Sequence, residues 1–263
     1  MSLAETTDVA QGAGRDNAVV RLDGVSKQYG SGANALLALD KVSLSVSKGE
    51  FVCLLGASGC GKSTLLSLVA GLDQISGGTL DIDGKRVALM FQEAALFPWL
   101  SVAGNVELAL RLQGVGRADR KERARDLLEI VRLGGFGGKR PHELSGGMRQ
   151  RVALARALAQ NADILLMDEP FGALDAMTRD ILHDELERIW REQNLTVLFV
   201  THNVREAVRL GDRVILLSSR PGRVIEDFKI SHPRPRRIDS TEVAAQAAEI
   251  TDRLRAEVAR HAN

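Results

Sequence analysis

The chain has 263 residues, 44% of them apolar, which is enough for a large core in one domain with an insertion or in two small domains. Lysine and arginine (35) nearly balance aspartate and glutamate (34), so the sequence lacks the basic excess typical of nucleic-acid-binding proteins. It has no uncharged apolar run of about 18 residues and no signal-peptide pattern, so we expect a cytoplasmic protein without a membrane-spanning helix.

The N-terminal part predicts a tail followed by antiparallel strands. Residues 1–17 are small, polar and aperiodic, which is typical of a disordered tail. Short alternating or apolar segments follow at 19–22, 36–39 and 42–46, separated by turn-forming residues. The segment that contains Tyr29, the only tyrosine, is expected as a loop between the first two strands.

Residues 56–64 read Gly-Ala-Ser-Gly-Cys-Gly-Lys-Ser-Thr and match a phosphate-binding loop. The apolar segment 50–55 predicts a buried strand before the loop, and leucines at helical spacing predict a helix after it. The glycines allow successive N–H groups to point at one anion beside the positive end of the helix. A polyphosphate is the expected ligand, with Lys62 on its β- and γ-phosphates and Ser63 on Mg²⁺. The predicted nucleotide-binding residues of the loop are Gly56, Ala57, Ser58, Gly59, Cys60, Gly61, Lys62, Ser63 and Thr64.

Two further side chains near this loop have two interpretations each. A lone tyrosine is usually a packing residue, but we expect Tyr29 to stack on an adenine base, which offers a flat apolar face. Cys60 is most simply a tolerated loop residue; alternatively, its place at a helix start lowers its pKa, and ATP would then protect it from a thiol reagent. Because Cys53 and Cys60 both lie at the loop, the sequence has no disulfide framework and fits a reducing compartment.

The middle of the chain predicts a short sheet segment and then an insertion of helices. Residues 76–84 resemble a hairpin, and 87–91 predict a buried strand that ends at Gln92. The apolar segment 96–100, Leu-Phe-Pro-Trp-Leu, either packs between subdomains or forms a docking surface for an apolar or helical partner. The helices are predicted at 102–113 and 117–132, and from Gly146 onward after a glycine-rich turn at 134–138.

The core resumes at 164–169, where four apolar residues precede Asp168 and Glu169. A helix at 175–191 and a strand at 196–200 follow, and this strand ends in Thr201-His202. Parallel strands deliver the residues that follow them to one edge of the sheet, where ligands bind. One carboxylate can therefore support Mg²⁺ while the other acts on water. Strands that end at Gly56, Gln92, Asp168 and His202 are predicted to share this edge, and segments 214–217 and 222–227 complete the sheet.

The C-terminal part predicts a linker and a helix. Residues 233–237, Pro-Arg-Pro-Arg-Arg, have the composition of an extended basic linker. Apolar residues then recur at steps of four, three, four and four, which predicts an amphipathic helix. Docking on its own domain is the favoured use of this helix, and contact with a partner is the alternative. The apolar positions are Val243, Ala247, Ile250, Leu254 and Val258.

Residues 144–151, Leu-Ser-Gly-Gly-Met-Arg-Gln-Arg, carry a family resemblance. Together with the phosphate loop, Gln92, the Asp168-Glu169 pair, Asp175 and His202 in this order, they resemble the ATP-binding subunit of ABC transporters over about residues 18–230. Segments 91–100, 168–175 and 220–223 are similar to bacterial importers of nitrate, aliphatic sulfonates and taurine. Two features depart from this group: six residues separate Gly84 from Phe91, fewer than expected, and Asn203 stands at a usual aspartate position.

The resemblance implies an α/β fold, with a P-loop NTPase core, an N-terminal antiparallel β subdomain and an inserted α-helical subdomain. The expected division is a tail at 1–17, an ATPase domain at 18–232 with its insertion at about 101–160, and a linker with a helix at 233–263.

The resemblance also implies roles for individual residues. Glu169 is expected as general base, His202 on the γ-phosphate, and Gln92 as a sensor of Mg²⁺ and the attacking water. The implied catalytic residues are Glu169, His202, Gln92 and Lys62, and the implied metal-binding residues are Ser63, Gln92 and Asp168. Further nucleotide-binding residues are Tyr29, Gln92, Ser145, Gly146, Gly147 and Asp175, with 145–147 used on ATP held by the other subunit.

The implied cofactors are ATP and Mg²⁺. The implied partners are a second ATPase subunit of the same or a paired kind, an integral membrane permease and an extracytoplasmic substrate-binding protein. No nucleic-acid partner is expected. The expected location is the cytoplasmic face of the membrane. The alternative is a soluble ABC-type ATPase of ribosomes, DNA repair or cluster assembly; a single phosphate loop and no long coiled coil disfavour it. A small-molecule kinase leaves 144–147 unexplained, and an exporter would normally have fused membrane helices.

Overall fold

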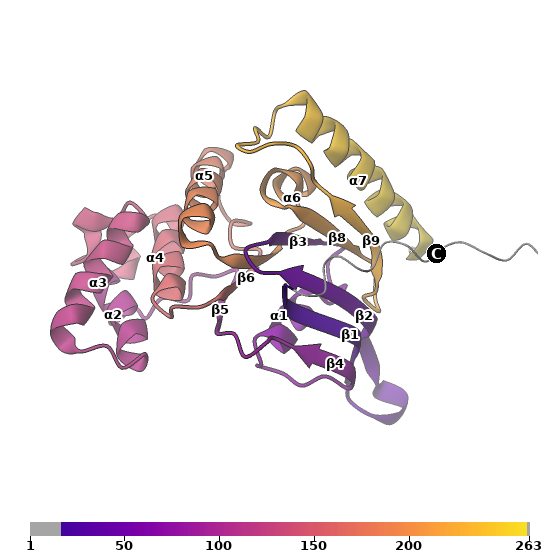
Figure 1. The fold of residues 1–263 in the computed structure, drawn as a ribbon, viewed down its shortest axis with the longest axis horizontal. Helices are drawn as coiled ribbons and strands as arrows, with labels where there is room; N and C mark the ends of the chain where they lie inside the picture. The colour runs from indigo at the N-terminus through magenta and orange to yellow at the C-terminus, as the bar shows by residue number, and fades with distance from the viewer. Residues whose placement is uncertain (1–16, 262–263) are drawn as a thin grey trace, which may run out of the picture.

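The computed structural model describes residues 17–261 and forms two sheets with helices around them (Figure 1). Apart from residue 17, the predicted N-terminal tail lies outside the described residues. The strands are β1 (Ala18–Tyr29), β2 (Leu36–Ser47), β3 (Phe51–Leu55), β4 (Gly77–Asp81), β5 (Val87–Met90), β6 (Ile164–Asp168), β7 (Thr196–Val200), β8 (Arg213–Leu217) and β9 (Val224–Lys229). The helices are α1 (Lys62–Val69), α2 (Val102–Leu112), α3 (Arg117–Ile130), α4 (Gly146–Leu158), α5 (Ala176–Gln193), α6 (Val204–Leu210) and α7 (Thr241–His261).

The larger sheet has the strand order β5-β6-β7-β3-β8-β9. Its neighbouring strands are parallel except for β9, which runs antiparallel to β8. Every residue of β3 and β7 is buried, which explains why these strands have continuous apolar sequences rather than alternating ones. The predicted shared edge is confirmed, because the carboxyl ends of β3, β5, β6 and β7 lie side by side.

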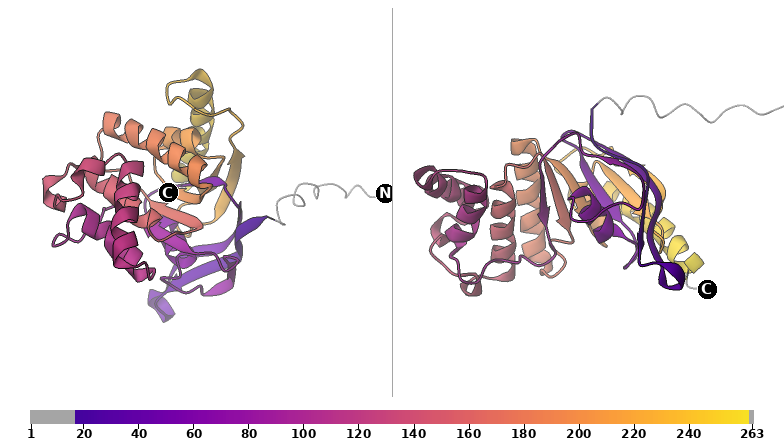
Figure 2. Two further views of the ribbon diagram at one scale, coloured as in Figure 1. Left: turned by 60° about the vertical axis from the view of Figure 1, so that its left-hand side comes forward. Right: turned by 90° about the horizontal axis from the view of Figure 1, so that it is seen from below.

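The two faces of this sheet pack against different layers. Phe51, Cys53 and Leu55 of β3 join a core formed with α4, α5, α6 and α7. Val52 and Leu54 join a second core formed with α1 and the antiparallel sheet. Alternate residues of one strand thus hold a three-layer arrangement together. In Figure 1 and in the left panel of Figure 2, helices of one layer lie above the larger sheet, and the antiparallel sheet lies below it.

The smaller sheet has the order β2-β1-β4 with antiparallel pairing, as predicted for this part of the chain. Three details of the prediction are wrong. The segments 36–39 and 42–46, predicted as separate strands, form the single strand β2. Tyr29 is the last residue of β1 rather than a loop residue, and β4 pairs with β1 rather than within a hairpin. Register shifts near Gly24 interrupt the alternation of β1 and make it look shorter. At Gly78, φ is +82°, and a Cβ would lie 2.3 Å from the Gly24 oxygen, so the two strands approach closely there.

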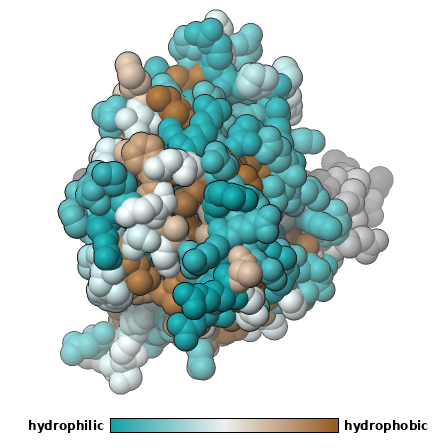
Figure 3. Space-filling model, turned by 90° about the vertical axis from the view of Figure 1, so that its left-hand side faces the viewer, coloured by the Kyte–Doolittle hydropathy of each residue, from teal (hydrophilic) through white to brown (hydrophobic). Residues whose placement is uncertain are grey.

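Helices α2, α3 and α4 form the predicted helical insertion, on the left in Figure 1. Helix α4 lies between the other two helices and the rest of the molecule, and its buried residues belong to the same core as the sheet. The outer face of this insertion is mostly hydrophilic, with apolar groups at several places between the charged ones (Figure 3). Among residues 17–261, no helix is both long enough and apolar enough to cross a membrane.

The prediction of a basic linker at 233–237 is wrong. Arg236 is only 5% exposed and donates to main-chain oxygens of Val208 and Gly211, at 3.1 and 2.5 Å. Arg234 Nη2 lies 2.8 Å from Asp212 Oδ1, and its guanidinium stacks on the Trp190 ring. These contacts fix the segment to the core. Helix α7 follows and packs on α6, as the favoured interpretation predicted; Val243, Ala247 and Ile250 are buried, Leu254 is half-buried and Val258 is exposed.

Candidate nucleotide-binding site

The turn from β3 to α1 requires glycine at particular positions. Gly61, the N-cap of α1, has φ +99°, and a Cβ there would lie 2.6 Å from Leu39 Cδ2 and 2.9 Å from the Ala38 oxygen. Gly59 also has a positive φ, +75°. The β3 strand, this turn and the first turn of α1 therefore form the compact loop with free N–H groups that an anion needs.

An open cavity of about 520 Å³ lies over this turn, within the size range of small-molecule sites. The ends of four strands meet at this cavity. Strand β1 ends in Tyr29, β3 leads into the loop, β5 precedes Gln92, and β6 ends in Asp168 just before Glu169. The lining residues are Tyr29, Leu36, Ala38, Ser58, Gly59, Gly61, Lys62, Ser63, Thr64, Gln92, Asp168, Glu169 and Arg220. Most of the residues predicted to bind the nucleotide and metal thus come together.

The remaining loop residues lie beneath the cavity. Lys62 Nζ donates to the carbonyl oxygens of Gly56 and Ala57, at 2.9 and 3.0 Å, so these two residues hold the lysine rather than line the cavity. Cys60 is 1% exposed, and burial raises the pKa of its thiol above the ordinary value. Burial outweighs the opposing charge of Lys62, whose Nζ lies 3.8 Å from Cys60 Sγ, so the direction of the pKa shift is against the alternative of an activated, low-pKa cysteine.

Oxygen ligands suited to Mg²⁺ meet at the end of β6. The Ser63 hydroxyl bonds to Asp168, and Gln92 lines the same cavity. Burial raises the pKa of Asp168, and the hydrogen bond from Ser63 opposes this effect. Within the described chain, no three His, Cys, Asp or Glu side chains could hold a metal ion by themselves. One carboxylate, one hydroxyl and one amide fit Mg²⁺ well, since this ion usually takes further ligands from phosphates and water.

Glu169 and His202 form a pair beside the cavity. His202 Nδ1 lies 2.9 Å from Glu169 Oε2, and the imidazole is 66% exposed. Glu169 has φ +45°, a backbone conformation that is unfavourable for glutamate, and its N–H bonds to the Val200 oxygen at 3.0 Å. Strained residues of this kind persist where the surroundings fix them, often at active sites. The carboxylate is thereby aimed at the region between the cavity and His202.

Tyr29 is held by two residues that sequence reasoning missed. Its hydroxyl donates to Asp73 Oδ2 at 2.9 Å, and Lys27 Nζ lies 4.8 Å from the ring centroid. Lys27 also bonds to Asp73, at 2.5 Å, and this bond is the largest of several that lower the pKa of Asp73. No sequence signal links Asp73 to Tyr29, because the contact joins the end of β1 to the turn after α1.

Helix α4 holds the segment that follows β5. Gln150 Nε2 donates to the Gln92 oxygen at 2.7 Å, and Arg156 donates to the oxygens of Ala94 and Ala95, at 2.9 and 2.7 Å. Arg220, from the loop after β8, bonds to the Gly59 oxygen and lines the cavity. No role at the site was predicted for these three residues, although Gln150 and Arg220 stand in the segments 144–151 and 220–223 that carry the family resemblance.

Residues 145–147 and Asp175 lie apart from the cavity. Of the described residues that line it, none belongs to this set. Ser145 caps α4 by accepting from the Met148 N–H, and Asp175 caps α5 by accepting from the Thr178 N–H. A Cβ at Gly147 would lie 2.4 Å from Thr178 Cγ2, so the starts of the two helices pack together. One chain therefore presents these residues as a second, separate group.

Segment 96–100 packs in part against the core and in part faces outward, so docking of a partner on it stays a prediction. Leu96 packs against the core, whereas the Trp99 side chain is 69% exposed. The Phe97 and Trp99 rings are 5.4 Å apart, and the buried Asn105 bonds to the Phe97 N–H at 2.8 Å. The segment is thus held in place and presents the exposed ring of Trp99.

Comparison with known proteins identifies relatives over most of the chain. Residues 39–172 match the family model described as ABC transporter. The taurine import ATP-binding protein TauB of Burkholderia pseudomallei (strain 1710b) is 51% identical over 217 residues, covering 80% of this chain and 84% of TauB. The nitrate import ATP-binding protein NrtD of Synechocystis is 47% identical, covering 76% and 77%. The aliphatic sulfonates import ATP-binding protein SsuB of Bacillus cereus is 43% identical, covering 82% and 88%.

A solved structure shows the same fold. It is the dimeric, post-hydrolysis state of the ATP-binding cassette MJ0796 bound to ADP and Pi. The TM-score is 0.73 and the sequence identity 35%, with 81% of this chain and 100% of that chain covered. The predicted fold class is therefore confirmed.

Proposed function

The chain belongs to the ABC transporter family and is an ABC-type ATPase, and we propose that it is the energy-coupling subunit of a bacterial importer. The observation that supports this role most directly is the grouping of Lys62, Ser63, Asp168 and Glu169 around one cavity. The importer role is supported by the relatives named for import.

The arrangement suits phosphoryl transfer from ATP to water. Lys62 and the loop N–H groups bind the phosphates, which holds the γ-phosphate at the end of β6. Mg²⁺, when bound by Ser63, Asp168 and Gln92, neutralises phosphate charge. Glu169 accepts a proton from the attacking water, and His202 contacts the γ-phosphate and orients the Glu169 carboxylate through their 2.9 Å hydrogen bond.

We further propose that two chains pair head to tail. Ser145, Gly146 and Gly147 begin a helix and suit an anion, yet they lie away from the cavity of their own chain. In a two-fold dimer, each group would complete the cavity of the partner. ATP would favour the closed dimer because only there does it contact both groups, and hydrolysis would let the dimer reopen.

The exposed apolar segment is the proposed contact with a membrane permease. Phe91 and Trp99 are 50% and 69% exposed, which is unusual for aromatic side chains without a partner. Trp99→Ala should therefore weaken permease binding and leave the hydrolysis of ATP by the isolated chain unchanged. Leu112→Ala is the matched control, because Leu112 is 78% exposed on another part of the insertion. Equal losses for both variants would contradict this assignment.

The test of the proposed function is to tag the Glu169→Gln chain, solubilise native membranes gently with ATP, and identify what copurifies. Recovery of a multi-helix permease, with or without an extracytoplasmic binding protein, would support the importer and the cytoplasmic membrane face as its location. If only ribosomal or other soluble partners copurify, the assignment as an ATPase stands and the assignment to transport is wrong.

Taurine, nitrate and aliphatic sulfonates are the proposed cargo classes, on the strength of the relatives' names. The complex reconstituted in vesicles with its binding protein should hydrolyse ATP faster when the correct cargo is present. If taurine, nitrate and an aliphatic sulfonate all fail to accelerate hydrolysis, this choice of cargo is wrong.

A further inference from the structure

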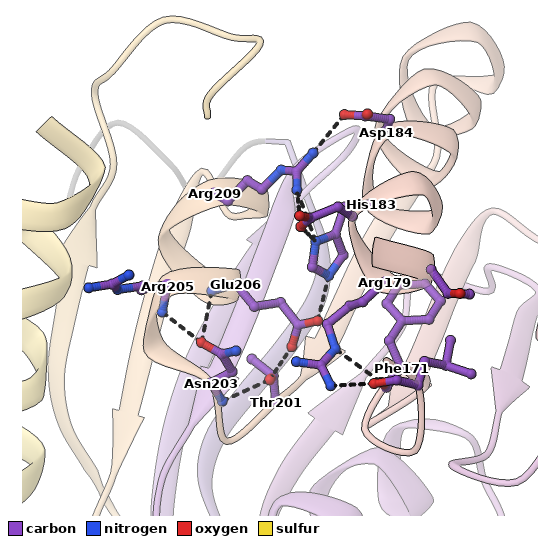
Figure 4. A network of polar contacts seen from close by, with 12 residues as sticks. Phe171, Arg179, His183, Asp184, Thr201, Asn203, Arg205, Glu206 and Arg209 are labelled. Atoms are coloured by element: carbon purple, nitrogen blue, oxygen red, sulfur yellow. Dashed lines mark hydrogen bonds and ion pairs between the residues drawn. The ribbon is translucent and has the colours of Figure 1, made fainter. Parts of the chain in front are cut away.

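A chain of polar side chains connects α5 to the residue that precedes His202 (Figure 4). His183 of α5 is completely buried; its Nε2 lies 2.6 Å from Glu206 Oε1, and its Nδ1 lies 3.2 Å from Arg209 Nη1. Glu206 and Arg209 are both on α6, 5% and 6% exposed. Thr201, 2% exposed at the end of β7, is hydrogen bonded to the other oxygen of Glu206. Three separate elements therefore meet in one buried network.

The partners determine which atom donates each hydrogen. An arginine has no acceptor, so Arg209 donates and His183 Nδ1 accepts; His183 Nε2–H then donates to Glu206. The Thr201 hydroxyl also donates to Glu206, whose carboxylate oxygens accept. The network thus fixes which ring nitrogen of His183 donates, and it leaves the Thr201 oxygen to accept from the main chain. Arg209 is balanced in turn by Asp180 and Asp184, at 3.0 and 2.6 Å.

Thr201 uses this orientation to hold the main chain around His202. Its Oγ1 accepts from the Asn203 N–H at 2.9 Å, and its own N–H donates to the Leu54 oxygen at 3.2 Å. Asn203 Oδ1 then accepts from the N–H groups of Arg205 and Glu206, at 3.1 and 3.3 Å, which caps α6. The residues on both sides of His202 are therefore fixed by buried or capping bonds.

His202 itself has little side-chain support. It is 66% exposed, and its hydrogen bond with Glu169 is one that the γ-phosphate or water can replace. Its direction is consequently determined by its main chain, whose position depends on Thr201. We propose that Thr201 and Glu206, oriented by His183 and Arg209, are positioning residues for His202 in ATP hydrolysis. This inference rests on the proposed function, which places His202 at the γ-phosphate.

A purely structural interpretation is that the network only joins α5 to α6. The two interpretations differ in their effect on turnover. If the network positions His202, loss of the Thr201 hydroxyl should lower kcat without weakening ATP binding, because the phosphate loop and Tyr29 do not contact the network. If it only joins two helices, the same loss should lower the melting temperature and leave kcat per folded chain unchanged.

The test compares Thr201→Val, which keeps the shape and removes the hydroxyl, with Thr201→Ser, which keeps the hydroxyl. For Thr201→Val we expect kcat to fall between about 10- and 100-fold, the effect typical of a small misplacement near a reacting group, with the ATP Kd changed less than about twofold. Thr201→Ser should stay within about threefold of the parent kcat. Unchanged kcat in Thr201→Val, or no recovery in Thr201→Ser, overturns the proposal.

A control and a second pair of variants keep the test decisive. Thr251→Val makes the same chemical change on α7, where the hydroxyl bonds only within its own helix, and should leave kcat unchanged. If Thr201→Val does not fold, His183→Gln and His183→Met replace it. Glutamine can donate to Glu206 and accept from Arg209, whereas methionine cannot donate and its sulfur accepts only weakly. Higher kcat in His183→Gln supports the proposal, and equal kcat in the two variants overturns it.

The parent chain and Glu169→Gln are measured in the same assay. If the parent chain does not hydrolyse ATP, the proposed function fails. If the parent is active, Glu169→Gln is inactive and Thr201→Val is fully active, only the positioning role of Thr201 is overturned.

Discussion

The carboxyl edge of the larger sheet and the segment that leads into α7 both concentrate charged residues but use them differently. At the sheet edge, Asp168 and Glu169 remain partly exposed around a cavity and have few partners. In the C-terminal segment, the buried Arg236 and the partly buried Arg234 donate to main-chain oxygens and Asp212. A binding site thus leaves hydrogen-bonding capacity available around a cavity, whereas this structural cluster uses most of its capacity internally, with Arg234 Nη1 as an exception.

Arg236 illustrates the structural use of charge. Its guanidinium donates to five main-chain oxygens, those of Val208, Arg209, Gly211, Ile230 and His232. Burial, with the nearby Arg234 charge, lowers its pKa to about 10, so it stays charged at neutral pH. Carbonyls at the end of α6 lack partners within the helix, and Arg236 supplies donors to them.

The largest effect should come from Glu169→Gln at the sheet edge. Loss of the proposed general base should lower kcat for ATP by about 10²–10⁴-fold, the usual contribution of such a group. The ATP affinity and the melting temperature should stay near the parent values, because the amide keeps the shape of the side chain. Steady-state hydrolysis and equilibrium nucleotide binding measure the two quantities, and normal turnover would remove Glu169 from its role.

The matched change in the C-terminal segment is Arg236→Met, with Arg237→Met as control. Removal of Arg236 leaves several buried oxygens unpaired, which should lower the free energy of unfolding by about 3 kcal/mol. Arg237, whose side chain is 80% exposed and bonds only to Asp239, should contribute almost nothing. Denaturant unfolding checks the difference. Equal stability of the two variants, or a large loss of kcat per folded Arg236→Met chain, would contradict a purely structural role for Arg236.

Tyr29 should show a smaller effect, confined to affinity. Tyr29→Ala removes the proposed stacking on adenine and should raise the ATP Kd about 3- to 10-fold. Tyr29→Phe keeps the ring and loses only the bond to Asp73, so its Kd should change by less than about twofold. Titration with a fluorescent ATP analogue measures both. Equal losses in Tyr29→Phe and Tyr29→Ala would show that the hydroxyl, and not the ring, supports ATP binding.

The smallest effect is predicted for the cysteines. Cys53 and Cys60 are 0% and 1% exposed, and burial raises the pKa of both thiols. Iodoacetamide should therefore label the folded chain slowly at neutral pH, with little change on addition of ATP. Mass spectrometry of intact protein measures the labelling. Fast labelling that ATP prevents would restore the activated-cysteine interpretation.

The sequence was informative where one strand or loop carries its own pattern. The continuous apolar strands β6 and β7, and the glycine spacing of residues 56–61, predicted the core and the phosphate loop, because burial on both faces and positive φ select residue types locally. The full length of β1 was missed because register shifts interrupt its alternation. The pairing of β4 with β1 was missed because pairing depends on the partner strand.

Contacts between distant elements could not be read from the sequence. Nothing in the Pro-Arg-Pro-Arg-Arg segment reveals that the carbonyls at the end of α6 will accept its hydrogen bonds. The network of His183, Thr201 and Glu206 joins α5, β7 and α6 in the same way. The separation of residues 145–147 from the cavity is also visible only in three dimensions. Because these residues lie away from the cavity of their own chain, the proposed dimer would place them at the cavity of the partner.

The most direct test of the account is to mix two inactive chains. Lys62→Ala disables the phosphate loop, and Ser145→Arg blocks the separate group that we propose acts on the partner's ATP. When equal amounts of the two chains form head-to-tail dimers at random, half of the dimers contain one chain of each kind. Each mixed dimer has one intact site out of two, so the mixture should recover about a quarter of the parent ATP hydrolysis. No recovery although mixed dimers form, or full hydrolysis by Ser145→Arg alone, would contradict the shared site.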